Sequence, residues 1–179
     1  MKALLTIAAA LLLAYAPRAV QVLNEPFRCA EIVNRLNEQG ENMTNVELAT
    51  RVAWSFIGTA YRWGGDDPMA GFDCSGFVIE ILKSVGKLPR VGDWSAAQLS
   101  EMFPKTTVPH EGCLVFYSST PGGHIIHVEY VIDDTRSIGA SGGGSSTNTV
   151  QDAINQDAYI KVRPFGGRQN IACFVNPFI

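Results

Sequence analysis

Closely spaced cysteines are missing from this sequence. It contains four cysteines, and no two of them form a CxxC pair. A metal site is therefore not expected, because structural zinc sites are built from such closely spaced ligands. In an exported protein these cysteines could form disulfides, although a domain of this size does not need them. If Cys74 is a free nucleophile, at most one bridge remains among Cys29, Cys113 and Cys173, and the sequence does not choose a pair.

An excess of positive charge is also missing. The chain has 14 lysines and arginines against 17 aspartates and glutamates, which gives a formal net charge of -3. Nucleic acid is therefore not an expected partner, because binding to phosphate backbones needs a concentrated basic surface. No internal repeat and no long low-complexity segment is present. A chain of 179 residues fits one compact domain with its own core.

The longest apolar run lies at the start of the chain, over residues 3–16, after a single lysine. This order is typical of a signal peptide, and the run is shorter than the roughly 18 residues usual for a membrane span. Pro17 fits poorly after a cleavage site, so an uncut membrane-associated helix and a buried helix remain alternatives. We therefore expect a signal or membrane-associated segment at residues 1–19, with any membrane contact made by residues 1–16, and a helical extension at residues 20–43.

Capping signatures mark helices in the first half of the domain. Thr44 is followed three residues later by Glu47, and Ser95 is followed in the same way by Gln98. Each pair is a capping box, in which two side chains satisfy the free N–H groups of a helix start. A third helix is expected to begin near Cys74. Its apolar residues recur at helical spacing up to Gly86, which is a suitable stop: Phe77, Val78, Ile81, Leu82 and Val85.

The second half of the domain changes to short β-branched and aromatic runs between turn residues. Strands are expected at residues 113–117, 125–132, 136–141, 158–163 and 171–175. The Gly-Gly-Gly-Ser-Ser segment at residues 142–146 is interpreted as a flexible loop between two of these strands. Helices followed by strands predict an α+β domain in which a helix packs on an antiparallel sheet.

Cys74 is a candidate nucleophile because of its place in the first turn of a helix. A cysteine attacks as the thiolate, so its pKa must fall below the usual value of roughly 8.5. The N–H groups and aligned dipoles of a helix start stabilise negative charge and predict such a fall. An isolated cysteine is otherwise more often a buried structural residue. His127 opens an expected strand and is the candidate base, whereas His110 and His124 lie in loops and are interpreted as surface residues.

Three stretches carry a resemblance to a known family. Residues 61–65 (Tyr-Arg-Trp-Gly-Gly), 73–76 (Asp-Cys-Ser-Gly) and 127–132 (His-Val-Glu-Tyr-Val-Ile) resemble the NlpC-type family of cell-wall cysteine peptidases. The match covers roughly residues 44–141 and agrees in residue type, order, spacing and expected secondary structure. It implies a papain-like fold over residues 44–179, with the nucleophile helix packed on a central antiparallel sheet.

The resemblance also implies a reaction. Family members cleave amide bonds in peptidoglycan stem peptides, often next to D-glutamate and a diamino acid, through a thioester and without a metal or organic cofactor. It assigns Cys74 as the nucleophile, with its own backbone N–H in the oxyanion hole, and His127 as the general base. Tyr61 matches an aromatic residue beside the nucleophile that can bond to substrate, although a core tyrosine is the alternative. Asp73 is expected to cap the helix and hold the loop, and Ser75 to shape the turn near the substrate.

One position departs from the family pattern. A third polar residue usually orients the base histidine, and the corresponding position here is Gly139, which has no side chain to do so. Glu129 occupies a position where the family often has a small residue, and strand alternation places it on the same face as His127. We hypothesise that Glu129 or a main-chain carbonyl replaces the missing group. An exposed or substrate-facing carboxylate is the alternative.

The sequence thus predicts a cysteine peptidase that acts on bacterial cell-wall peptide and is exported to the cell envelope or secreted. A phage-encoded protein that acts on the host wall during lysis would use the same domain. Two other functions stay open. One is a catalytically weak or inactive domain that binds peptidoglycan without cutting it, and the other is an amidase or acyltransferase on the same fold.

Overall fold

The computed structural model describes residues 43–179, and Thr44–Ile179 form one compact unit. The expected segment at residues 1–19, the extension up to residue 42 and Cys29 lie outside the described residues. Within residues 43–179, no helix has both the length and the apolar character needed to cross a bilayer.

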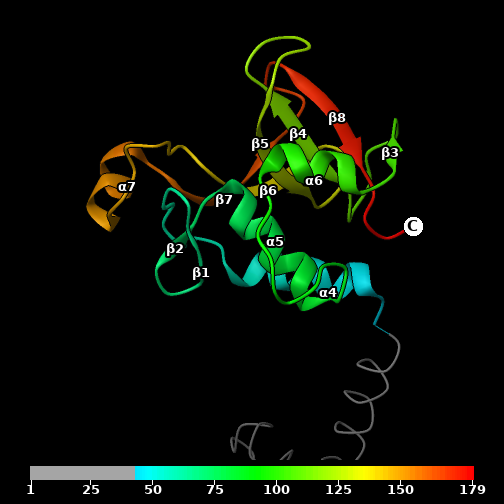
Figure 1. Ribbon diagram of the computed structural model, residues 1–179, viewed down its shortest axis with the longest axis horizontal. Helices are drawn as coiled ribbons and strands as arrows, with labels where there is room; N and C mark the ends of the chain where they lie inside the picture. The colour runs from blue at the N-terminus through cyan, green and yellow to red at the C-terminus, as the bar shows by residue number, and fades with distance from the viewer. Residues whose placement is uncertain (1–42) are drawn as a thin grey trace, which may run out of the picture. The chain divides into compact units, whose positions relative to one another are not determined.

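The described unit mixes helices with an antiparallel sheet. Its helices are α4 (Asn45–Ser55), α5 (Cys74–Ser84), α6 (Ala96–Met102) and α7 (Val150–Gln156), and its strands are β1 (Asp66–Asp67), β2 (Gly71–Phe72), β3 (Lys105–Thr106), β4 (Leu114–Ser118), β5 (Ile125–Val131), β6 (Arg136–Ser141), β7 (Tyr159–Pro164) and β8 (Ile171–Val175). Six strands form one sheet in the order β3-β8-β4-β5-β6-β7, whose neighbouring pairs are all antiparallel, while β1 and β2 form a separate hairpin (Figure 1). The expected α+β architecture is confirmed.

Local sequence explains where the helices begin. The capping boxes of α4 and α6 are both formed, with Thr44 and Ser95 as the N-caps. Helix α5 is capped by Asp73, whose Oδ1 accepts a hydrogen bond of 2.8 Å from the Gly76 N–H. The apolar side of α5 is fully buried at four large residues, each of which contributes about 1.5–3 kcal/mol by leaving water: Phe77, Val78, Ile81 and Leu82.

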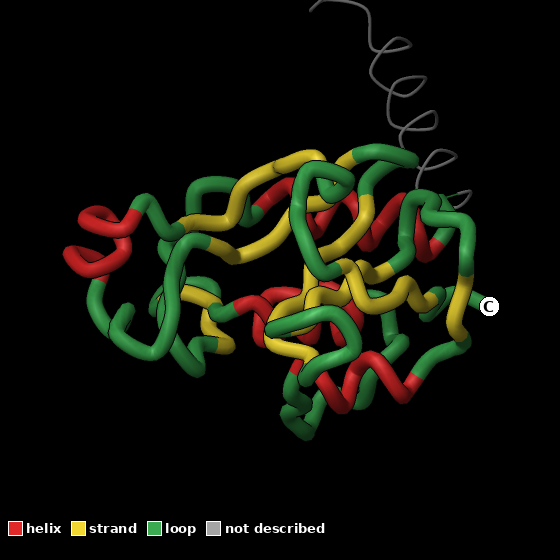
Figure 2. The backbone as a smooth tube through the Cα atoms, turned by 90° about the horizontal axis from the view of Figure 1, so that it is seen from above, coloured by secondary structure: helices red, strands yellow, loops and turns green. Residues whose placement is uncertain are grey.

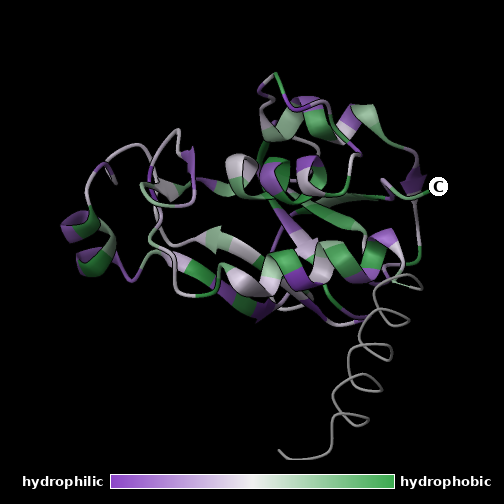
Figure 3. Cartoon of the chain, turned by 90° about the horizontal axis from the view of Figure 1, so that it is seen from below, coloured by the Kyte–Doolittle hydropathy of each residue, from purple (hydrophilic) through white to green (hydrophobic). Residues whose placement is uncertain are grey.

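The two faces of the sheet differ in what covers them. On one face, Val128 and Tyr130 of β5 join Ile138 and Ala140 of β6 in a core shared with α4, α5 and α6. Along α4 and α5 apolar and polar residues alternate, so that each helix has an apolar side for this core (Figure 3). The opposite face has a smaller apolar cluster, made by Cys113, Val115, Tyr117, Val131 and Phe165.

Strands β5 and β6 stay paired over only a short distance. Their register joins Tyr130 to Ile138 and Val131 to Ser137, and no pairing continues toward the start of β5. The N–H of Ile132 points to β6, where it donates to the Arg136 carbonyl, whereas the N–H of Val131 points to β4. Because this direction alternates along a strand, the N–H of Val128 also points to the β6 side, where β6 no longer pairs with it.

Helix α7 corrects the sequence analysis. The loop at residues 142–146 was expected to join two strands directly, but α7 follows it and lies at one end of the described unit (Figure 2). Thr149 and Asp152 form its capping box, yet only Ala153 of its seven residues is buried. So short a helix with one buried residue carries almost no hydrophobic periodicity. The hairpin of β1 and β2 and the short β3 were also not expected.

Candidate active site

Cys74 is the first residue of α5, as the sequence predicts. Its side chain lines a cavity of about 340 Å³ together with Tyr61, Asp73 and Ser75, which are the three residues that the sequence groups around it. The opposite wall comes from the start of β5 and from α6. Residues far apart in the sequence therefore meet in one hollow that holds the thiol.

The sulfur of Cys74 is more buried than the sequence analysis expected. Burial and the negative charge of Asp73 raise the pKa of the Cys74 thiol to about 11, although the backbone N–H groups of Val128, Ser75 and Cys74 itself work in the opposite direction. The expectation of a lowered pKa at the helix start is therefore wrong for the resting protein, because the cost of burying charge exceeds the benefit of the helix dipole. The thiol is protonated at neutral pH, so its attack on a substrate needs a base.

The contact from Val128 links Cys74 to β5. The N–H of Val128 points toward β6 but finds no partner strand there, and it is one of the backbone groups that lower the pKa of the Cys74 thiol. The parting of β5 from β6 therefore creates the place where the start of α5 meets the sheet. His127 is the neighbour of Val128 on the same strand, and from β5 it is Ile125 and Ile126, not His127, that line the cavity around the sulfur.

His127 and Glu129 are joined by a hydrogen bond along β5. The Nε2 atom of the His127 ring lies 2.9 Å from Oε1 of Glu129, and the Glu129 side chain is 1% exposed. Burial alone would raise the pKa of Glu129, but the hydrogen bond and charge of His127, the charge of Arg168 and a hydrogen bond from Ser137 lower it to about 2. Glu129 is thus a buried carboxylate that fixes one nitrogen of the ring and leaves Nδ1 free of it.

Four further side chains hold Glu129. Ser137 donates to Oε2 over 2.6 Å, while Arg163, Arg168 and Ser141 donate to Oε1 over 2.9, 2.5 and 3.3 Å. Sequence analysis missed all four. A charged residue inside a β-branched and aromatic strand was the available signal, because a buried carboxylate needs hydrogen-bonding partners. The sequence alone could not say which residues would reach it.

Gly139 lies directly against Glu129. A Cβ atom built on Gly139 would overlap the Cγ of Glu129 and come within 3.0 Å of its Cβ and Cδ. The space that a side chain at this position would need is therefore occupied by Glu129. The lack of a side chain at Gly139 on β6 and the presence of the Glu129 side chain on β5 therefore belong to one packing arrangement.

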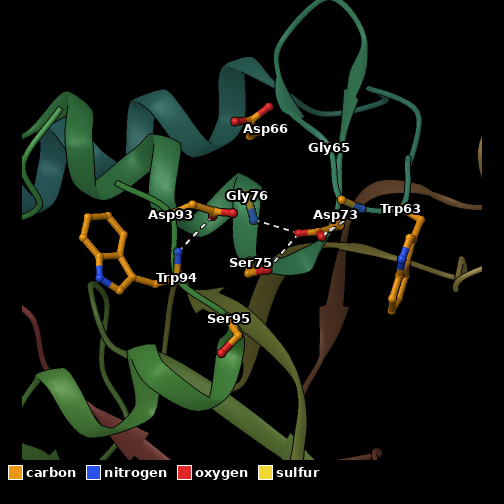
Figure 4. A pocket seen from close by; sticks show the side chains of 10 residues that line it. Trp63, Gly65, Asp66, Asp73, Ser75, Gly76, Asp93, Trp94 and Ser95 are labelled. Atoms are coloured by element: carbon orange, nitrogen blue, oxygen red, sulfur yellow. Dashed lines mark hydrogen bonds between the residues drawn. The ribbon is translucent and has the colours of Figure 1, made fainter. Parts of the chain in front are cut away.

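Asp73 acts mainly as a structural anchor. Its Oδ1 accepts from the Ser75 hydroxyl over 2.9 Å, and its Oδ2 accepts from the Gly64 N–H over 3.1 Å. These bonds tie the start of α5 to the preceding turn, as the sequence predicts. Asp73 and Ser75 also border a second hollow of about 260 Å³, with Trp63 and Trp94 at its sides (Figure 4).

Tyr61 belongs both to the core and to the cavity. Its side chain is 4% exposed, and its ring packs so tightly on Gly143 that a Cβ there would overlap it. Burial, followed by the charges of Cys74 and Asp73, raises the pKa of the Tyr61 hydroxyl. Tyr61 therefore remains a protonated donor beside the sulfur, and the two interpretations of this residue are compatible.

Among the described residues, neither of the other two histidines is hydrogen-bonded to Glu129. His124 is exposed in the turn before β5. Nε2 of His110 accepts a hydrogen bond of 3.0 Å from Nδ2 of Asn176, and Nδ1 of His110 lies 3.4 Å from the Cys113 sulfur, which is fully buried. Among the described residues, Cys74, Cys113 and Cys173 are all free of disulfides, and no cluster of three or more metal-binding side chains forms.

More than half of the sequence matches one known protein family. The family model described as the NlpC/P60 family matches residues 58–164, which is more than half of the chain and includes the site. The chain belongs to the NlpC/P60 family. The resemblance found in three short motifs thus extends over most of the described unit.

Known NlpC/P60 proteins agree with this assignment. The Bacillus subtilis protein named "Probable peptidoglycan endopeptidase LytE" is 28% identical over 124 residues, which cover 68% of this chain and 35% of LytE. The chain thus spans about a third of that relative's length. An NlpC/P60 family protein from Bacillus cereus has the same fold, with a TM-score of 0.61, 21% identity and coverage of 75% of this chain and 40% of that one. RipD from Mycobacterium tuberculosis, titled a non-catalytic NlpC/p60 domain protein, matches with a TM-score of 0.56 and 18% identity, over 75% of this chain and 98% of RipD.

Proposed function

We propose that this NlpC/P60 protein is a cysteine peptidase that hydrolyses amide bonds in peptidoglycan stem peptides. The observation that carries the proposal is the 2.9 Å hydrogen bond between His127 and Glu129 on β5, the strand whose first residues line the same cavity as Cys74. Cys74 begins α5, the helix that packs against this strand. Family membership and the similarity to LytE, which is named a probable peptidoglycan endopeptidase, support the choice of substrate.

The first half of the reaction forms a thioester. His127 takes the proton from the Cys74 thiol at Nδ1, because its Nε2 is held by Glu129. The thiolate attacks the carbonyl carbon of the amide, and the N–H at the start of α5 stabilises the oxyanion. Glu129 offsets the positive charge that the ring acquires. The tetrahedral intermediate then expels the amine, which takes the proton from His127, and leaves the acyl group on the sulfur.

The second half releases the acyl group. His127 takes a proton from a water molecule, and the resulting hydroxide attacks the thioester carbon. The sulfur leaves as a thiolate and recovers the proton from His127, while the product carries a new carboxylate. The bond next to D-glutamate and a diamino acid is the expected position of cleavage within the stem peptide. No step uses a metal or an organic cofactor.

Digestion of purified peptidoglycan tests the proposal. The wild-type protein should release soluble fragments whose masses show one new amine and one new carboxylate. Cys74→Ala should release none, because no other group can form the thioester. Cys173→Ala is the matched control, since Cys173 is a half-buried cysteine on β8 away from the cavity, and it should digest like the wild type. Equal digestion by Cys74→Ala and the wild type would reject the proposal.

A second candidate is a domain that binds peptidoglycan without cutting it. The specific observation in its favour is the Cys74 thiol, whose pKa is raised to about 11 by burial and by Asp73. RipD shares the fold and is titled an adaptation to peptidoglycan-binding function. On this candidate, the wild type and Cys74→Ala would sediment equally with insoluble peptidoglycan and neither would release fragments.

The place of action is also a proposal. Export to the envelope or secretion, guided by the apolar segment at residues 1–19, would bring the protein to its substrate. Cleavage of this segment predicts a mature chain that begins after residue 16. Mass spectrometry of the protein recovered from the medium and from the membrane fraction would show whether the segment is removed.

A further inference from the structure

Two arginines meet at one carboxylate oxygen beside the site. Nη2 of Arg163 on β7 and Nη1 of Arg168 in the loop between β7 and β8 both donate to Oε1 of Glu129, over 2.9 and 2.5 Å. Arg163 also contacts the Ser141 hydroxyl. Each arginine side chain is about 30% exposed, whereas Glu129 is 1% exposed. The carboxylate is therefore buried, and its two cationic partners reach it from the surface side.

Arg168 has a second contact that connects it to the candidate base. Its guanidinium carbon lies 4.0 Å from the centre of the Tyr117 ring, and that ring lies 5.7 Å from the ring of His127. Arg168, Tyr117 and His127 thus form one continuous series of contacts, in which the Tyr117 and His127 rings are tilted by 46° to each other. Tyr117 therefore contacts the imidazole, while Glu129 holds its Nε2 atom.

The two arginines offset the cost of burying the Glu129 carboxylate. Removing a carboxylate from water costs several kcal/mol unless cations and hydrogen bonds replace its solvation. A neutral histidine supplies one hydrogen bond but no charge. The hydroxyls of Ser137 and Ser141 likewise supply hydrogen bonds but no charge. Without the arginines, the carboxyl group would tend to take up a proton or turn toward water, and it would then no longer accept from His127.

We propose that Arg163 and Arg168 are positioning residues that keep the Glu129 carboxylate fixed on Nε2 of His127. The inference rests on the proposed function and extends it to two residues that do not contact the cavity. Arg168 has the larger role, because it makes the shorter bond to Glu129 and also stacks on Tyr117.

The groups that face Glu129 come from every element around it. They are Tyr117 on β4, His127 on β5, Ser137 and Ser141 on β6, Arg163 on β7 and Arg168 in the following loop. Only the two arginines carry a permanent positive charge. Substitution of an arginine should therefore change the protonation of Glu129 in a way that substitution of a serine does not.

The kinetic test compares Arg168→Met with a matched control. Arg168→Met should lower kcat about tenfold, with KM within twofold, because the substrate cavity is unchanged. Arg168→Lys keeps the charge and should recover part of the loss. Arg136→Met is the control, since Arg136 makes a surface ion pair with Asp133 away from Glu129, and its kcat should match the wild type. In Glu129→Gln protein, Arg168→Met should have little further effect, because the group that it positions is gone.

NMR of the isotope-labelled His127 ring provides a readout that does not need peptidoglycan cleavage. The wild type should show a slowly exchanging proton on Nε2, assigned by its loss in Glu129→Gln. This signal should weaken in Arg168→Met, and the protonation midpoint of Glu129 should rise by about one pH unit. An unchanged Nε2 signal and unchanged midpoint would overturn the inference even if the enzyme is active. Absence of cleavage by the wild type, with the NMR changes as expected, would reject the proposed function alone.

Discussion

The two faces of strand β5 carry opposite kinds of side chain. Toward α5, Val128 and Tyr130 are fully buried in the main apolar core. Toward the other side, His127 and Glu129 belong to a network of hydrogen bonds and ion pairs that reaches Arg163. Both faces use the same alternation of residues along one strand. The first face holds the fold together, and the second arranges the groups proposed for catalysis.

This difference shows how a new orienting group can arise without disturbing the fold. The Glu129 side chain fills the space above Gly139, and its partners come from the neighbouring strands and one loop. The core face needs none of these residues. Substitutions on the core face should therefore change stability by the same amount at every pH. Substitutions on the polar face should change the pH dependence of stability and the activity.

The largest effect is expected from Phe77→Ala on the core face. Phe77 is fully buried, so its truncation should lower the free energy of unfolding by about 3–5 kcal/mol. Denaturant unfolding at several values between acidic and neutral pH should give the same loss throughout. Ile154→Ala on the exposed side of α7 is the control and should change stability by less than about 0.5 kcal/mol. A loss of stability from Phe77→Ala that varies with pH would contradict the expected difference between the two faces of β5.

A smaller, pH-dependent effect is expected from Glu129→Gln. The pKa of Glu129 is lowered from its ordinary value of 4.5 to about 2 in the folded protein. The carboxylate therefore stabilises the fold fully above pH 4.5, and this stabilisation is lost as the pH falls through about 2. At neutral pH the variant should be less stable by about 2 kcal/mol. The difference in the free energy of unfolding between the variant and the wild type should shrink as the pH falls from 4.5 to about 2. A constant difference would contradict the assignment of Glu129 as a buried carboxylate.

The smallest effect on stability is expected from Gly139→Ala. The new Cβ would overlap the Glu129 side chain and displace it, at a cost of about 1 kcal/mol. Activity should fall more than stability does, because the displaced carboxylate loses its hydrogen bond to His127. Gly144→Ala is the matched control, since a Cβ at Gly144 meets open space. Similar activities for the two alanine variants would show that Glu129 does not orient the ring.

Local and periodic signals predicted the core face well. The capping boxes at Thr44 and Ser95, the helix start at Cys74 and the bounds of β6 and β8 are all as expected. Each depends on residues close together in the sequence, so the pattern can be seen directly. Placing Glu129 and His127 on one face also needed only strand alternation.

The remaining features depend on contacts between distant parts of the chain. Arg163 and Arg168 reach Glu129 from 34 and 39 residues away, and no spacing rule joins them. The pKa of Cys74 depends on how deeply the packed domain buries the sulfur, which overrides the favourable helix start. Helix α7 has too few buried residues to leave a periodic signal.

Trapping of the acyl group with hydroxylamine tests most directly whether Cys74 forms a covalent intermediate. Hydroxylamine competes with water for a thioester, so digestion of peptidoglycan in its presence should convert part of the new carboxylate ends to hydroxamates, which mass spectrometry identifies. The wild type should form hydroxamates in amounts that increase with hydroxylamine concentration, and Cys74→Ala should form none. Fragments that carry only free carboxylates at every hydroxylamine concentration, or hydroxamates made by Cys74→Ala, would contradict it.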